Sequence, residues 1–292
     1  MPSPLHEAFV TLFHAHVDLA LRLARQVGVE LSSPREAWKA AGGEFADPSG
    51  QGKRYATDVV LAALSPESES LALEVLILEP QLSFEPEKAV SWLVYRGGVA
   101  ARYGHCPQWV LTISPAPRVL VRYREEVYTH NRELQPIFVG PGSVSPVLDL
   151  AEAQADPIWA AFCAAMHCRG PLGLAAAEIA IRAGAELPAD ARRCTLQLLA
   201  AGMKKGQMQE ILNRASKTTK VELTEYEREG AWYLHGLEDG LRSALFITMS
   251  IRDLVPDLEL RARIEACDDA EQLQCWVERA SRASTLAEVF AT

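Results

Sequence analysis

The sequence contains no long hydrophobic run. None of its apolar stretches approaches the roughly 18 residues that a membrane-spanning helix needs, and its first residues lack the pattern of a signal peptide. Apolar residues make up 49% of the chain and charged residues 23%, which is ordinary for a globular protein. We therefore expect a cytoplasmic protein with no membrane partner, built as one large domain or as a compact domain with an appendage.

Paired cysteines are also lacking. The chain has six cysteines, and none of them forms a C-x-x-C pair. In a cytosolic protein such residues are expected to be reduced thiols in the core. Cys163, His167 and Cys168 could be imagined as metal ligands. Three ligands on one short helix without a distant fourth make a poor zinc site, so buried thiols are the simpler interpretation.

A basic surface is not indicated, because the formal net charge is −9. Phosphate contacts need basic side chains, so this charge argues against a protein that coats nucleic acid non-specifically. It does not exclude a nuclease in which the positive charge is local and includes a metal ion.

Two familiar motifs are missing as well. Gly140-Pro141-Gly142 is not followed by Gly-Lys-Ser/Thr, so it predicts a turn and not a phosphate loop. His6-Glu7 is not followed by a second histidine at the spacing of a zinc protease.

The most informative segment runs from Arg54 to Lys88. Its pattern predicts two strands, over Val59–Leu64 and Leu71–Leu78, joined by a polar turn at Ser65–Ser70. Side chains alternate between the faces of a strand, so the second strand would continue its apolar face into Glu79 and Gln81. Burying a carboxylate without partners is costly, so a glutamate at the end of an apolar strand face calls for an explanation.

A shared metal ion is one such reason. If the two strands form a hairpin, Asp58 and Glu79 come close together, and two convergent carboxylates can hold a hard divalent cation. Glu74 is a competing choice, but it falls on the opposite face of the same strand.

These residues carry a family resemblance. The order Asp58, Glu79-x-Gln81, Pro86-x-Lys88 and Trp92-x-x-Tyr95 resembles the recombination-promoting nuclease-like branch of the PD-(D/E)xK superfamily. The first residues, from Pro2 to Ala8, and the segment from Arg261 to Trp276 also look like bacterial members of that group.

The resemblance implies a metal-dependent endonuclease that hydrolyses DNA. Asp58 and Glu79 would bind Mg²⁺ or Mn²⁺ with the backbone carbonyl of Pro80, and Gln81 would orient the attacking water. From the residues themselves, Lys88 is a candidate for the missing positive charge in the catalytic site. Candidates for further contacts are Glu7 for the metal and Arg54 and Arg96 for substrate phosphates.

Structural roles for these residues stay open. Glu7 would also suit the first turn of a helix, where the dipole favours an acid. Lys88 alone is more often a surface lysine, and Trp92 and Tyr95 at helical spacing are more often core residues than platforms for a base.

The expected fold is α/β (α+β), with a restriction-endonuclease-like core in residues 1–150. A small mixed sheet would be flanked by helices, and residues 151–292 would form an all-helical C-terminal region. Other predicted strands are Glu44–Ala46, Trp109–Ile113, Ile137–Val139 and Val144–Leu148, and other predicted helices are Leu5–Val27, Glu85–Tyr103, Pro157–Cys168, Leu172–Ala183, Ala189–Met203 and Glu222–Ile251. Capping boxes are expected at Asp268 and Thr285.

Two alternatives to an active nuclease remain. Pro80 in the strand, Gln81 where many relatives carry lysine, and the acidic net charge favour a nuclease fold that serves only as a binding or regulatory module. A helical oligomerisation scaffold, with a homodimer formed through the C-terminal helices, is the third hypothesis.

Overall fold

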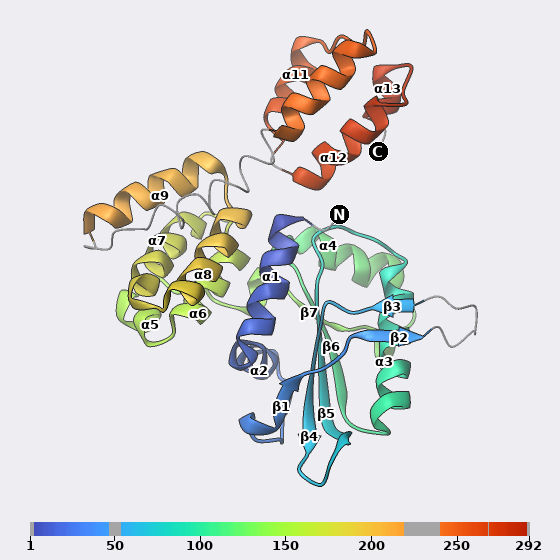
Figure 1. Ribbon diagram of the computed structural model, residues 1–292, viewed down its shortest axis with the longest axis vertical. Helices are drawn as coiled ribbons and strands as arrows, with labels where there is room; N and C mark the ends of the chain where they lie inside the picture. Colours follow the sequence, from blue (N-terminus) through green and yellow to red (C-terminus); the bar gives the residue numbers. More distant parts are fainter. Residues whose placement is uncertain (1–2, 47–53, 219–239, 268, 291–292) are drawn as a thin grey trace.

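The computed structural model of the chain describes residues 3–46, 54–218, 240–267 and 269–290. Within these ranges the protein combines a mixed five-stranded sheet, a small two-stranded sheet and many helices (Figure 1). The mixed α/β class predicted from the sequence is therefore confirmed.

The main sheet has the strand order β1-β4-β5-β6-β7. Strand β4 pairs antiparallel with β1 and β5, whereas β5, β6 and β7 run parallel to one another. The second sheet pairs β2 with β3. The strands are β1 (Trp38–Ala40), β2 (Glu44–Ala46), β3 (Arg54–Ala56), β4 (Val59–Ser65), β5 (Ser68–Pro80), β6 (Gln108–Ile113) and β7 (Ile137–Val139).

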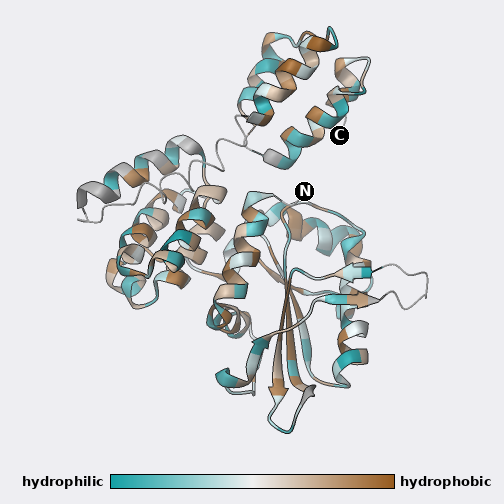
Figure 2. Ribbon diagram, in the orientation of Figure 1, coloured by the Kyte–Doolittle hydropathy of each residue, from teal (hydrophilic) through white to brown (hydrophobic). Residues whose placement is uncertain are grey.

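Helices cover both faces of the main sheet. One face packs against α3 (Lys88–Tyr103) through Val75, Ile77, Trp92 and Tyr95. Because both faces are buried, β4 to β6 are apolar along most of their length and do not alternate with polar residues (Figure 2).

The other face packs against helices from both ends of the main body. Its core joins β4, β5 and β6 to α1 (Pro4–Ala15), α2 (Val17–Gln26), α6 (Pro157–Met166), α7 (Gly173–Ala183) and α8 (Ala189–Gly202). The helices α6, α7 and α8, which follow residue 150, therefore share a core with the amino-terminal helices and the sheet.

The amino-terminal segment differs from its prediction. The apolar spacing predicts one helix over Leu5–Val27, but the structure has two, because His16 leaves the helical conformation at φ −130° and ψ 76°. The prediction was wrong because the apolar pattern continues across the break, and neither proline nor glycine marks it.

The central hairpin follows its prediction with a shorter turn. Strand β4 pairs with β5 in a register that places Val59 opposite Leu78. Strand β5 extends through Pro80, which lies opposite Ile113 of β6 at the end of the ladder. Proline is tolerated at this end of the strand because the next residue continues the ladder. The backbone N–H of Gln81 donates a 2.8 Å hydrogen bond to the Ile113 carbonyl.

Three further predictions need correction. The α3 helix begins at Lys88 and not at Glu85, Val144–Leu148 forms no strand, and no strand was predicted at Trp38–Ala40, where β1 lies. Val144 and Val147 are nonetheless buried in the core, which explains why an apolar segment there resembled a strand. The predictions for β2, β4, β6 and β7 were confirmed.

The remaining helices complete the body and a C-terminal cluster. They are α4 (Pro117–Arg122), continued by a π-helical turn at Tyr123–Val127, then α5 (Leu150–Ala155), α9 (Lys205–Thr218), α11 (Leu258–Glu265), α12 (Ala270–Ala280) and α13 (Leu286–Val289). Residues 240–251 are helical, and the rest of the predicted helix Glu222–Ile251 lies outside the described residues. Helix α12 is capped by Asp269, whereas the predicted capping residue Asp268 lies outside the described residues; the Thr285 cap is confirmed.

Two adjacent glycines in α3 offer a test of the packing. A Cβ atom at Gly98 would lie 2.3 Å from the ring of Phe45, which is buried, whereas one at Gly97 would meet nothing within 4 Å. We expect Gly98→Ala to lower the free energy of unfolding by about 1–3 kcal/mol through overpacking. Gly97→Ala should raise it by up to about 1 kcal/mol. Denaturant titration of both variants checks this, and equal effects would contradict the packing described.

Candidate functional site

The site forms where β4 begins and β5 ends. Asp58 directly precedes β4, and Glu79 lies beside it on β5 because of the hairpin register. The Asp58 backbone N–H donates a hydrogen bond of 3.0 Å to Oε1 of Glu79. The expectation that the hairpin brings these two residues together is confirmed.

Glu79 is fully buried, with no exposed side-chain surface. It continues the face of Val75 and Ile77, which packs beneath α3. Its second oxygen, Oε2, has no hydrogen bond of normal geometry among the described residues, although Lys88 Nζ lies 3.6 Å away and the indole of Trp92 is close enough to lower the pKa of Glu79. A buried carboxylate oxygen in this state is costly, so it marks a place where a further positive ligand would be stabilising.

The surroundings hold the proton on Glu79. Burial, and then the negative charge of Asp58, raise the pKa of Glu79 to about 7, although the charge of Lys88 opposes both. Tyr95 packs nearby, and its hydroxyl donates a 2.7 Å hydrogen bond to the Ala56 carbonyl. Burial and the charges of Glu79 and Asp58 raise the pKa of Tyr95.

Histidines of α1 also contact Asp58, and sequence reasoning missed them. Nε2 of His6 lies 3.0 Å from Oδ2 of Asp58, and Nε2 of His14 lies 3.2 Å from its backbone oxygen. Burial lowers the pKa of His6, but the hydrogen bond and charge of Asp58 outweigh it, so this pKa lies above its usual value. These contacts span 52 and 44 residues of sequence, and no local motif signals them.

Gln81 occupies the next position beyond the strand. Its Nε2 donates a 2.8 Å hydrogen bond to the Ser83 carbonyl, and the Ser83 hydroxyl donates one of 2.8 Å to Glu85. Because the amide nitrogen is held by Ser83, the orientation of the Gln81 side chain is fixed.

A pocket of about 300 Å³ opens over these groups. Most of its lining is polar, and its walls come from α1, the start of β4, the end of β5 with the following loop, and α12. The lining residues are His6, Asp58, Pro80, Gln81, Leu82, Ser83, Glu85, Lys88 and Glu271. Glu271 is a further residue that sequence reasoning missed, because it follows the hairpin by almost 200 residues of sequence.

Three predicted site residues lie elsewhere. Glu7 is exposed and does not line the pocket. Arg54, on β3, forms a 3.1 Å ion pair with Glu44. Arg96, about two helical turns after Lys88 on α3, lies near Tyr128 and lowers the pKa of that tyrosine against the effect of burial. The structure therefore does not bring these three residues to the pocket.

Glu74 has the structural role that its position on the other face predicts. Its carboxylate accepts hydrogen bonds from the backbone N–H groups of Ser32 and Ser33, at 2.9 and 2.7 Å. Burial raises its pKa, but these hydrogen bonds outweigh burial and hold the pKa below its usual value. The pKa values of the two buried glutamates of β5, Glu74 and Glu79, are thus shifted in opposite directions.

The oxygen donors fit a divalent cation. The described residues contain no group of three or more His, Cys, Asp or Glu side chains arranged as a metal site. However, Mg²⁺ is usually held by one or two carboxylates together with water and substrate phosphates. Asp58 and the unpartnered Oε2 of Glu79 meet that requirement, with the Gln81 side chain beside them.

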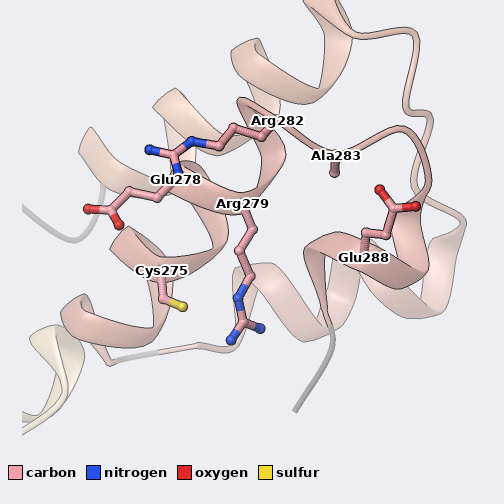
Figure 3. Close-up of a pocket in the computed structure, with 6 residues that line it drawn as sticks. All are labelled: Cys275, Glu278, Arg279, Arg282, Ala283 and Glu288. Carbon is pink, nitrogen blue, oxygen red and sulfur yellow. The ribbon is translucent and has the colours of Figure 1, made fainter.

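Another pocket, of about 350 Å³, lies within the C-terminal cluster (Figure 3). Cys275, Arg279 and Arg282 line it from α12 and its end, and Glu288 faces them from α13. Its acids already have partners, since Glu288 accepts a hydrogen bond from the Ser284 N–H and Glu278 accepts one from Gln274. This pocket lacks an unpartnered buried group of the kind found at Glu79.

Comparisons of the chain with protein-family models, with curated proteins and with solved structures found no match. Among the described helices, none combines the length and apolar character that crossing a lipid bilayer requires.

The raised pKa of Glu79 predicts how stability depends on pH without metal. Between its unfolded pKa of about 4.3 and the folded value near 7, the folded protein holds the extra proton, so stability falls as pH rises through this window. Glu79→Gln should remove the cost of ionising a buried carboxyl group, and should raise the free energy of unfolding at pH 8 by on the order of 2 kcal/mol. Denaturant titrations in EDTA at pH 5 and pH 8 measure this.

Glu74→Gln is the matched control on the same strand. The pKa of Glu74 is lowered, so its contribution to stability is present above its unfolded pKa and is lost as pH falls. This variant should therefore be less stable than the parent at pH 8. The same direction of change in both variants would show that the environment of Glu79 is described wrongly.

Proposed function

We propose that this protein is a metal-dependent phosphodiesterase that hydrolyses DNA at the Asp58–Glu79 site. The observation that carries the proposal is Oε2 of Glu79, a fully buried carboxylate oxygen without a hydrogen-bond partner among the described residues. It lies beside Asp58 and Lys88, which line a solvent-accessible pocket, although Glu79 itself is fully buried and does not line that pocket. Buried groups with raised pKa values and specific charged neighbours in a cleft are typical of functional sites.

The carboxylates of Asp58 and Glu79 would hold Mg²⁺ or Mn²⁺, with the backbone carbonyl of Pro80 and the side-chain carbonyl of Gln81 as further oxygen donors. Such a cation, when bound, lowers the pKa of water and neutralises charge that develops on a phosphate. The resemblance to PD-(D/E)xK nucleases supports this assignment, and the mixed sheet is compatible with a restriction-endonuclease-like core.

Three side chains of the protein would position the substrate phosphate, the attacking water and the Asp58 carboxylate. Lys88 begins α3 and is 28% exposed, so its ammonium group can reach both Glu79 and a phosphate oxygen in the pocket. Gln81 is an amide and cannot take up a proton, so it orients water by hydrogen bonding. His6 holds the Asp58 carboxylate in place.

A binding or regulatory module without catalysis is the second candidate. Two proposed catalytic side chains already have partners within the protein, which favours this candidate. The Asp58 carboxylate contacts His6, and the Gln81 amide contacts Ser83. The mouth of the pocket also carries Glu85 and Glu271, which repel phosphates.

Cleavage of supercoiled, linear and single-stranded nucleic acids in Mg²⁺ and Mn²⁺ tests the proposal. We expect metal-dependent cleavage of DNA by the parent protein. Asp58→Asn and Glu79→Gln, which keep the shape of each side chain, should lower the rate by at least about 100-fold, because both remove charge from the reacting centre. Glu74→Gln serves as the control, since Glu74 lies on the same strand outside the pocket.

The variants also separate the two candidates. Cleavage that persists in Asp58→Asn and Glu79→Gln would place the activity elsewhere. A parent protein that binds DNA without cutting any substrate would support the binding module.

A further inference from the structure

The loop between β5 and α3 carries two of the proposed catalytic side chains at its ends. Gln81 begins the loop directly after β5, and Lys88 ends it as the first residue of α3. Ser83 and Glu85 lie between them, and all four residues line the candidate pocket. The shape of this loop therefore determines where the amide of Gln81 and the ammonium group of Lys88 lie.

A series of hydrogen bonds joins the two ends of the loop. The Gln81 side chain donates to the Ser83 carbonyl at 2.8 Å, and the Ser83 hydroxyl donates to the Glu85 carboxylate at 2.8 Å. The Glu85 carbonyl accepts a 3.0 Å hydrogen bond from the backbone N–H of Lys88. Glu85 is thus the residue at which the two halves of the loop meet.

The hydroxyl of Tyr123 holds the backbone of Glu85 from outside the loop. It accepts a 3.0 Å hydrogen bond from the Glu85 N–H and donates one of 2.8 Å to the Glu85 carbonyl. A hydroxyl group can do both at once, because it is a donor and an acceptor. Tyr123 is fully buried, and the ring also packs against Phe84 of the loop, with ring centroids 4.8 Å apart.

A π-helical turn brings Tyr123 to this position together with Tyr128. The Tyr128 N–H donates a 3.0 Å hydrogen bond to the Tyr123 carbonyl, five residues earlier. Five residues span about 1.4 turns of an α-helix, so a regular helix would point the two rings to different sides. In the π-helical turn both rings pack with Trp92 and Phe138. Turns of this kind occur frequently at functional sites.

The two tyrosines differ in what their hydroxyl groups contact. The Tyr128 hydroxyl is buried and bonds to no described residue. The Tyr123 hydroxyl bonds twice to Glu85. The shared aromatic cluster therefore accounts for both rings, whereas the link to the pocket loop belongs to Tyr123.

We propose that Tyr123 is a positioning residue for the candidate site, because its hydroxyl fixes Glu85 in the middle of the pocket loop. The anchored loop holds two groups at the pocket: the Gln81 amide that would orient the attacking water, and the Lys88 ammonium group that would contact a substrate phosphate. The roles of these two side chains rest on the proposed function, whereas the anchoring of the loop does not.

The metal-binding carboxylates should be independent of this anchor. Asp58 and Glu79 are joined by the hairpin register and by their own hydrogen bond of 3.0 Å. Loss of the Tyr123 hydroxyl should therefore disturb the groups that position water and phosphate and leave the cation site as it is.

Hydrogen exchange of the full chain, without metal or nucleic acid, tests the anchor. Tyr123→Phe removes the hydroxyl and keeps the ring, so the amides of Glu85 and Lys88 should exchange about three- to tenfold faster. The amides of β4 should exchange as they do in the parent. Tyr128→Phe is the matched control, since it removes a hydroxyl that bonds to no described residue from the same cluster, and it should leave the loop unchanged.

Unchanged exchange at Glu85 in Tyr123→Phe would overturn the proposal. Equal acceleration in the loop and in β4 would also overturn it, because the hydroxyl would then support the whole fold and not the loop. The same acceleration of the loop in Tyr128→Phe would show that packing of the cluster, and not the hydroxyl of Tyr123, holds Glu85.

Cleavage kinetics test the positioning itself. The kcat for DNA in Mn²⁺ should fall about tenfold in Tyr123→Phe, while the Kd for Mn²⁺ stays within about twofold of the parent value. In a Gln81→Ala background the same substitution should lower kcat by only about threefold or less, because one of the two groups that it positions is already gone.

A tenfold fall in both backgrounds, or a fall that accompanies weaker Mn²⁺ binding, would contradict a positioning role. No cleavage by the parent would reject the proposed function, and the exchange experiment would then decide whether Tyr123 anchors the loop.

Discussion

The hydrogen bond from the Asp58 backbone to Glu79 is the constraint on which the candidate site depends. It fixes a carboxylate at the end of an apolar strand face, where burial would otherwise exclude it. The helix α3 then covers the same face and presents Lys88 to the second carboxylate oxygen. The result is a buried acid whose pKa is raised to about 7, with one carboxylate oxygen held by the Asp58 N–H and the other 3.6 Å from the Lys88 ammonium group.

Much of this arrangement could be predicted from the sequence because it is local. Asp58, Glu79, Gln81 and Lys88 are linked by a hairpin and a short loop, so strand periodicity and one turn determine their neighbourhood. The same periodicity separates Glu74 from Glu79, and the structure confirms it: Glu74 bonds to the Ser32 and Ser33 backbone on the other face.

The rest depends on contacts that no local pattern records. His6 reaches Asp58 because α1 packs against β4 and β5, and Glu271 reaches the pocket because a separate helical cluster contributes to its lining. Because a sequence pattern carries no tertiary contacts, it also places in the site a residue that lies elsewhere in the structure. Arg54 is close to Asp58 in sequence, but β3 pairs with β2 and turns its side chain toward Glu44.

The most direct test of the central claim is calorimetric titration of the protein with Mn²⁺ at pH 8, where Glu79 is largely ionised. The account predicts binding that is lost in Glu79→Gln and strongly weakened in Asp58→Asn, while Glu74→Gln binds as the parent does. Absence of binding in the parent, or equal binding in Glu79→Gln, would contradict the assignment of these carboxylates to a cation site.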